Sequence, residues 1–182
     1  MMSPEKSNAL IVELARQLRE RESWCGETHL QKTAYFLKEL MKVPLSYDFI
    51  LYKYGPYSFD LTEQINILRA DDVFRLQPHG NYGPTIVEGK HVSWLTGQHQ
   101  EIIKRYQKEI EFIAEQLADK KVADLERLGT ALYVTRENQT TIGAIERAER
   151  LHQLKPHISL EEALEAVQEV DTLIEKVRIA MQ

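Results

Sequence analysis

Cysteine, basic charge and long apolar runs are the features that this 182-residue sequence has least of. Its single cysteine, Cys25, excludes an internal disulfide framework and a zinc site built from several thiolates. No run approaches the roughly 18 apolar residues of a membrane span, and the N-terminal segment lacks the apolar stretch of a secretory signal. We therefore expect a cytoplasmic protein without a metal, a cofactor or a membrane partner.

The balance of charge is acidic, with 23 Lys plus Arg against 28 Asp plus Glu and a formal net charge of -5. Binding to phosphate backbones needs clustered cations, so this balance argues against strong non-specific affinity for nucleic acid. With 43% hydrophobic residues the chain can bury a continuous core. No Gly-, Ser- or Pro-rich linker lies near residue 96. We therefore expect a mixed α/β part over residues 1–95 and a helical part over residues 96–182, closely packed as a single unit.

Two helices are predicted at the start of the chain. Ser3, followed by a proline, predicts a helix over about residues 4–21. Thr28 and Gln31 have the spacing of a capping box and predict the start of a second helix, which Pro44 ends.

A strand, a third helix and a hairpin follow. The aromatic and β-branched segment YDFILYKY, residues 47–54, predicts a strand with Ile50 and Leu51 in the core. Ser58 predicts the cap of the third helix. Over residues 73–95, VFRLQ and HVSWL predict the two strands of a hairpin, with the turn-rich PHGNYGP at its tip.

The rest of the chain is predicted to be helical. Residues 96–121 carry apolar side chains at alternating spacings of three and four, which predicts one long amphipathic helix. Three further helices follow; Ile145 and Leu151 mark the apolar side of the second, and Ser159 with Glu162 caps the last. The fold class is therefore mainly α with a small antiparallel β element, winged-helix-like in its N-terminal half and helical in its C-terminal half.

The segment FILYKYGPYSFDL, residues 49–61, is the most distinctive part of the sequence. Its rings have two interpretations: a core strand that turns at Gly-Pro, or tyrosines displayed on a rigid corner for a partner to bind. The second interpretation makes one run of five residues the candidate partner-binding site: Lys53, Tyr54, Gly55, Pro56 and Tyr57.

Three short motifs carry a resemblance to known families. An LQK motif at Leu30, Gln31 and Lys32 precedes the KYGP motif at residues 53–56, and LKPHISLEEA follows at residues 154–163. With these motifs the chain resembles the YwgA-like proteins and, more distantly, the Panacea domain of SocA-type antitoxins. The resemblance implies a non-enzymatic protein-binding regulator, antitoxin-like, whose partner is another protein such as a toxin. It leaves open whether the chain forms a homo-oligomer.

The winged-helix-like order of elements suggests an alternative, a nucleic-acid-binding transcriptional regulator. The third helix and its exit carry four acidic residues and only one basic residue, Arg69. A helix that enters a DNA groove needs basic and amide side chains, so this composition argues against the function. A second route to DNA would use the lysines of the second helix, Lys32, Lys38 and Lys42. An anion site at Lys53 beside the start of the third helix is disfavoured by Asp60.

Catalysis has little support in the sequence. The six histidines are scattered, and no pair has the spacing of metal ligands on one helical face. Cys25 and His29 are four residues apart, but a lone cysteine of this kind is typical of packing rather than of a nucleophile. We predict no catalytic and no metal-binding residue, and a hydrolase with a divergent site remains the enzyme alternative.

Overall fold

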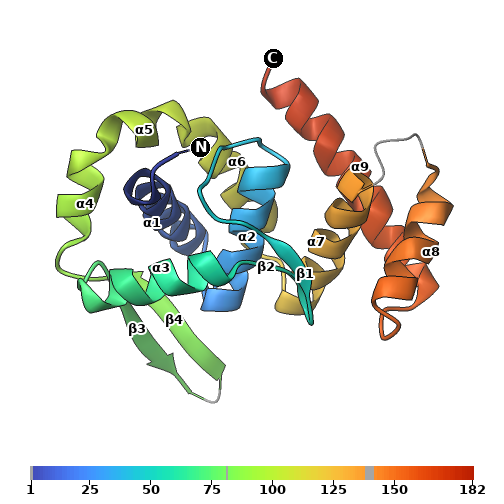
Figure 1. The fold of residues 1–182 in the computed structure, drawn as a ribbon, viewed down its shortest axis with the longest axis horizontal. Helices are drawn as coiled ribbons and strands as arrows, with labels where there is room; N and C mark the ends of the chain where they lie inside the picture. Colours follow the sequence, from blue (N-terminus) through green and yellow to red (C-terminus); the bar gives the residue numbers. More distant parts are fainter. Residues whose placement is uncertain (1, 81, 138–141) are drawn as a thin grey trace.

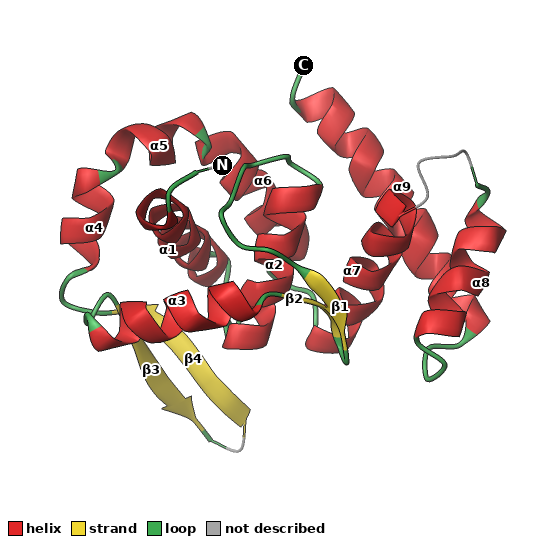
Figure 2. Cartoon of the chain, viewed as in Figure 1, coloured by secondary structure: helices red, strands yellow, loops and turns green. Residues whose placement is uncertain are grey.

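The computed structural model describes residues 2–80, 82–137 and 142–182. The helices are α1 (Pro4–Glu20), α2 (Glu27–Glu39), α3 (Phe59–Ala70), α4 (Val92–Gln98), α5 (Gln100–Arg105), α6 (Gln107–Leu117), α7 (Val122–Glu137), α8 (Ala144–Leu154) and α9 (Leu160–Ala180). The strands form two antiparallel pairs, β1 (Ile50–Tyr52) with β2 (Gly55–Tyr57), and β3 (Phe74–His79) with β4 (Tyr82–Glu88). The predicted fold class, mainly α with a small antiparallel β element, is confirmed (Figure 2).

Helix α1 lies at the centre of the first part of the chain. Ser3 caps it as predicted, because its hydroxyl accepts a hydrogen bond from the backbone N–H of Lys6. Leu10, Leu14 and Leu18 are fully buried along its length. Helices α2, α4, α5 and α6 all pack against α1, and α4 to α6 form an arc around it (Figure 1).

That arc corrects two predictions. The segment HVSWL forms α4 rather than a strand, and its buried residues Val92 and Leu95 are three apart, which is helical spacing. The single long helix predicted over residues 96–121 is wrong, since the chain breaks at His99 and again at Tyr106. A straight helix would contact α1 only near one crossing point, whereas three short helices follow its surface.

The hairpin β3–β4 follows α3 and projects from the body of the molecule (Figure 1). Its second strand is Tyr82–Glu88, so it begins within the predicted tip, residues 78–84, and ends before the segment HVSWL that was predicted to form it. The base of the hairpin is held by Phe74 and Ile86, which are buried, and Ile86 N–H donates to the carbonyl of Cys25 at 3.0 Å. The prediction of a hairpin in this region is confirmed, and the position of its second strand is corrected.

The last three helices pack together at the C-terminal side (Figure 1). Ser159 and Glu162 form the predicted capping box of α9 in both directions. Leu151 is buried as predicted, but Ile145 is 63% exposed because it lies on the outer side of the first turn of α8. Helix α7 also packs against α2 and β2, and this contact joins the last three helices to the first part of the chain.

The buried apolar side chains of both halves belong to one continuous core. Helix α6, which comes after residue 96, contributes to it by packing on α1 and α2. Across the ranges that the structure describes, no helix is both long and apolar enough to cross a membrane.

Candidate functional site

The site is built around residues 52–58, which we call the corner. Strands β1 and β2 pair Tyr52 with Gly55, so that Lys53 and Tyr54 form the turn. The strand predicted over residues 47–54 is therefore much shorter than expected. The first residues of the predicted segment do not form a strand. There Tyr47 is buried, and its hydroxyl donates a hydrogen bond to the side-chain oxygen of Asn8 at 2.7 Å.

Two glycines allow the corner to lie directly on α7. Gly55 has a φ of 86°, a backbone conformation that favours glycine. A Cβ at Gly55 would lie 3.3 Å from the carbonyl oxygen of Glu126, and a Cβ at Gly129 would lie 3.1 Å from Pro56 Cδ. Gly55 and Pro56 are buried in this contact, so these two predicted site residues support the corner from within.

Lys32 of α2 holds the corner from below. Its side chain is almost fully buried, and its Nζ donates to the carbonyl of Pro56 at 2.8 Å. Burial lowers the pKa of this amine to about 8, an effect that nearby Glu126 opposes and nearby Lys155 reinforces. A lysine in this position cannot reach a phosphate backbone, which removes one of the three cations from the predicted DNA-binding route.

Lys155 holds the same corner from the C-terminal helices. It lies in the connection between α8 and α9, and its Nζ donates to the carbonyls of Tyr52 and, at 2.6 Å, of Lys53. Burial lowers its pKa as well, and Glu126 again opposes the effect. Two buried ammonium groups thus bind three backbone carbonyls of one seven-residue segment.

Gln31 completes the hold on the corner. Its amide nitrogen donates to the carbonyl of Ser58 at 2.9 Å, and its amide oxygen accepts from the N–H of Ser58 at 3.0 Å. The predicted capping box of Thr28 and Gln31 is therefore wrong, and α2 begins after Gly26 without a side-chain cap. Ser58 itself caps α3 as predicted, with Leu61 N–H donating to its hydroxyl at 3.2 Å.

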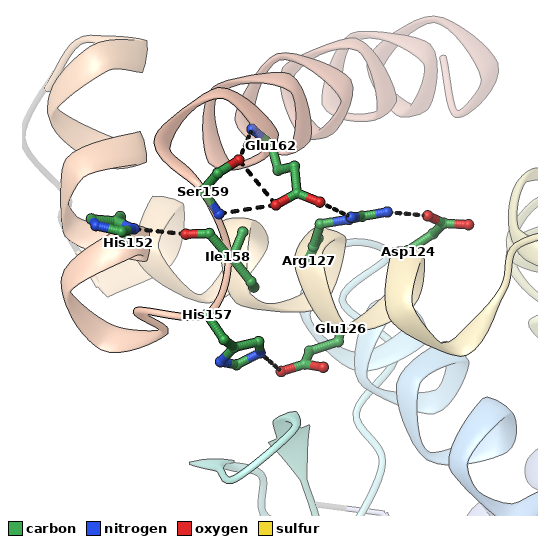
Figure 3. Close-up of polar contacts among 8 residues, drawn as sticks. All are labelled: Asp124, Glu126, Arg127, His152, His157, Ile158, Ser159 and Glu162. Atoms are coloured by element: carbon green, nitrogen blue, oxygen red, sulfur yellow. Dashed lines mark hydrogen bonds and ion pairs between the residues drawn. The ribbon is translucent and has the colours of Figure 1, made fainter.

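The connection that carries Lys155 is itself fixed to α7, as Figure 3 shows. The imidazole of His157 lies 3.0 Å from a carboxylate oxygen of Glu126. Arg127 binds both Asp124 and Glu162, each at 2.5 Å, and so ties α7 to the first turn of α9. The position of the Lys155 backbone is therefore set from both sides.

On its outer side the corner presents aromatic rings to solvent. Tyr52 is 52% exposed, Tyr54 57% and Phe59 57%. The ring of Tyr52 lies 5.5 Å from that of Phe59, and the ring of Tyr57 lies 5.0 Å from it, centroid to centroid. The rings of Tyr52, Tyr57 and Phe59 thus form one cluster, and Tyr54 is exposed at the adjoining turn; we call these four rings the aromatic surface.

The predicted site residues thus separate into two groups. Lys53 and Tyr54 are exposed, with the Lys53 amine 5.2 Å from the centre of the Tyr54 ring. Tyr57 is half-buried, and its hydroxyl lies 2.5 Å from that of Thr62. Phe59 was not among the predicted site residues. Its position outside the apolar stripe of α3 was the available signal, since Leu61, Ile65 and Leu68 form the buried side.

Ile50 was predicted to be in the core and is 48% exposed, while Leu51 is half-buried. The sheet has only the two strands β1 and β2, and the face that carries Ile50 and Tyr52 is covered in part by the Phe59 ring of α3, which leaves Ile50 and Tyr52 about half exposed. Ile50 therefore extends the apolar character of the aromatic surface.

Cys25 and His29 do not form a reactive pair. The Cys25 thiol is buried, donates to the carbonyl of Ala15 at 3.6 Å, and has its pKa raised to about 11 by burial. His29 contacts Ser23 and the carbonyl of Leu117, and burial lowers its pKa. Among the residues that the structure describes, no group of three or more His, Cys, Asp or Glu side chains is placed to hold a metal ion.

The remaining lysines of α2 and its exit differ from Lys32 in their surroundings. Lys38 donates to the carbonyl of Tyr47, and Lys42 is exposed, with its amine 3.8 Å from Glu39. Only Lys42 of the three has the exposure that a phosphate contact needs.

Comparison with protein-family models and with curated proteins finds no match to this chain. The resemblance to YwgA-like proteins and the Panacea domain therefore stays a prediction carried by its three motifs. In the structure these motifs meet at one place: Lys32 comes from the first, residues 53–56 are the second, and Lys155 comes from the third.

Proposed function

We propose that this chain is a non-enzymatic protein-binding regulator, antitoxin-like, that binds its partner through the aromatic surface. The observation that carries the proposal is the combination of exposed rings with a backbone that buried groups hold in place. Tyr52, Tyr54 and Phe59 are each more than half exposed, while Lys32 and Lys155 bind the carbonyls beneath them.

Burying two lysine amines costs free energy, and the fixed backbone that results supports a role for the shape of the corner. Burying an ammonium group is unfavourable unless hydrogen bonds and a nearby opposite charge compensate it, and here Glu126 supplies the charge. A short two-stranded hairpin is only marginally stable by itself. Fixing it before binding lowers the entropy that a partner must overcome, and tyrosine supplies a large contact area with few rotatable bonds.

The choice of a protein as partner rests on the same surface. Clustered exposed aromatics are enriched at the energetic centres of protein interfaces. The resemblance to Panacea-type antitoxins supports a toxin as that protein, and we place the complex in the cytoplasm, where the thiol of Cys25 stays reduced. The nucleic-acid alternative has weaker support, because Lys32 and Lys38 already donate to backbone carbonyls.

Photo-crosslinking in cells tests the proposal. A benzophenone amino acid at Tyr54 is expected to capture one discrete protein, whereas the same group at Trp94, which is 61% exposed on α4, is expected not to capture it. Capture at Tyr54 should be lost when Phe59→Ala is added and kept when Ile179→Ala is added, since Ile179 is exposed at the far end of α9.

Equal capture at both positions, or capture that ignores Phe59→Ala, contradicts the proposal. A captured species that nuclease treatment removes would instead support the nucleic-acid alternative.

A further inference from the structure

Four carboxylates border the aromatic surface. They belong to Glu27, Asp48, Asp60 and Glu63, all of which are exposed. The backbone N–H of Asp48 donates to the carboxylate of Asp60 at 3.0 Å, which places both residues beside Phe59.

The other two carboxylates lie on the side of Tyr57. Glu27 accepts a hydrogen bond from the Thr62 hydroxyl at 3.2 Å, and that hydroxyl also contacts Tyr57. Glu63 comes one helical turn after Phe59, so both side chains share the outer side of α3. Carboxylates therefore lie at more than one edge of the aromatic surface.

Little positive charge offsets this border. Lys38 approaches Asp48 at 3.4 Å, and Lys53 lies at the turn. In the described ranges, Glu27, Asp60 and Glu63 take part in no ion pair. The Lys53 amine lies over the Tyr54 ring, 5.2 Å from its centre, so this ring already contacts a cation of the chain itself, while no such contact involves the exposed rings of Tyr52 and Phe59 in the described ranges.

We propose that the partner binds here through a basic, arginine-containing segment, whose guanidinium groups lie on the aromatic surface and face the bordering carboxylates. This inference rests on the proposed function and adds the chemistry of the partner. Arginine fits both features, because its planar cation stacks on aromatic faces and pairs with carboxylates through directed hydrogen bonds. Long-range attraction by the carboxylates would also raise the rate of association with a basic partner.

Other occupants fit less well. A phosphate backbone would be repelled by the same carboxylates. A second copy of this chain also carries a net charge of -5 and would bring like charges together at this surface. An acidic protein meets the same repulsion.

A peptide-display selection tests the chemistry of the occupant directly. A random twelve-residue library is selected on the full chain and counter-selected on a Tyr52→Ala/Tyr54→Ala/Phe59→Ala variant, whose fold is checked by circular dichroism. The expected binders carry net positive charge and are enriched in arginine over the unselected library. Binders that are neutral or acidic, or no enrichment relative to the variant, overturn the proposal.

Removing the bordering charge provides the second measurement. For one selected peptide, Asp60→Asn/Glu63→Gln is expected to weaken binding by about fivefold or more, because each exposed carboxylate contributes a modest Coulomb term. Glu115→Gln/Glu149→Gln makes the same change in net charge at exposed positions on α6 and α8, and should leave binding unchanged. If both variants weaken binding equally, the effect comes from the net charge of the protein and not from the bordering carboxylates, and the proposal is overturned.

The outcomes separate this inference from the proposed function. If crosslinking at Tyr54 captures a protein that depends on Phe59 but the selected peptides are not basic, the function stands and the inference fails. If crosslinking captures no protein while basic peptides are still selected and depend on the carboxylates, the surface chemistry stands and the regulatory function fails.

Discussion

The two hairpins of this protein are stabilised in opposite ways. Strands β1 and β2 have three residues each, and groups from α2 and from the connection between α8 and α9 hold them. Strands β3 and β4 are about twice as long and pair along an extended register from Phe74 and Glu88 at the base to His79 and Tyr82 at the end. The difference teaches that buried side chains distant in sequence hold the backbone of the short hairpin at its turn, whereas the long hairpin combines a longer ladder of its own with contacts from Arg19, Trp24 and Cys25.

The two hairpins also differ in where they contact the rest of the molecule. The turn end of β1–β2 lies against α7, where a Cβ at Gly55 would already be in tight contact. The β3–β4 hairpin is anchored at its base, where Arg19 donates to the carbonyl of Ile86 at 3.2 Å, and near its far end the ring of His79 contacts that of Trp24, 4.2 Å between centroids, while the hairpin projects away from the helices (Figure 1). The short hairpin therefore presents exposed rings on a backbone that Lys155 holds at the turn itself.

The largest expected loss of stability comes from removing a buried side chain at the base of the long hairpin. Phe74→Ala deletes a fully buried ring at its base and should lower the free energy of unfolding by about 3–5 kcal/mol, through lost burial and the cavity left behind. Chemical denaturation measures this change. Gln77→Ala, an exposed position further along the same strand, is the control and should change stability by less than about 0.5 kcal/mol. Similar losses for both variants would mean that the ladder matters more than the base.

The next prediction compares two glycines, one near the turn of each hairpin. Gly55→Ala should destabilise by about 2–3 kcal/mol, since a φ of 86° strains any side chain and the new Cβ meets the backbone of Glu126. Gly80→Ala should cost only about 1 kcal/mol, because its φ is also positive, at 54°, but no atom lies within 4 Å of the new Cβ. Thermal unfolding of the two variants measures the difference. Equal costs would mean that the packing of the corner on α7 contributes nothing.

The third effect is a pH dependence that only the short hairpin should have. Burial lowers the folded pKa of Lys32 to about 8, below its value near 10.4 in an unfolded chain. Between these values the unfolded state binds more protons, so stability rises with pH. From about pH 8 to pH 9.5 the wild type should gain about 1 kcal/mol relative to Lys32→Met, which keeps the apolar stem.

The upper limit of this window is set by two buried tyrosines. Burial raises the pKa of Tyr35 and of Tyr47, so their ionisation in the unfolded state lowers stability above about pH 10. Lys155, whose pKa is also lowered, remains in both proteins, but it lies near Lys32 and reinforces the lowering of that pKa, so the difference between the two curves reports the pair of amines together. Parallel curves of stability against pH for the two proteins would contradict a buried charge at Lys32.

Local signals in the sequence predicted three helix caps but not the hydrogen bonds from distant side chains that fix the corner. Ser3, Ser58 and the Ser159–Glu162 pair act through neighbours within three residues, and each was predicted correctly. Gln31 had the same local spacing from Thr28, yet its amide pairs with Ser58 across 27 residues. A side chain with one local and one distant partner cannot be assigned from spacing alone.

The buried lysines were beyond the reach of sequence patterns for a related reason. Lysine is almost always exposed, so Lys32 was predicted to lie on the surface, among the lysines of the alternative DNA-binding route. Lys155 contacts the corner from about a hundred positions away, and no periodicity connects them. The segment HVSWL failed differently, because Val92 and Leu95 fit a short helix as well as a strand, and only their packing on α1 decides between the two.

The smallest effect on stability should accompany the largest effect on binding. Lys53→Ala/Tyr54→Ala removes two exposed side chains from the turn of the short hairpin, and the Lys53 carbonyl that Lys155 binds remains in place. The free energy of unfolding should therefore change by less than about 0.5 kcal/mol. Binding of the protein captured at the aromatic surface should fall by about tenfold or more, because a central tyrosine of an interface contributes well above the average residue.

The control for this double variant lies on the other hairpin. Gln77→Ala/Pro78→Ala also removes two exposed side chains near the end of a strand, and we expect it to leave both stability and binding unchanged. Tyr57 is left intact in both proteins, since its hydroxyl contact with Thr62 would mix stability into the measurement. A corner variant that unfolds early would make the turn part of the scaffold. A corner variant that folds normally and binds at full strength, with binding lost instead in the control, would assign the interface to the β3–β4 hairpin.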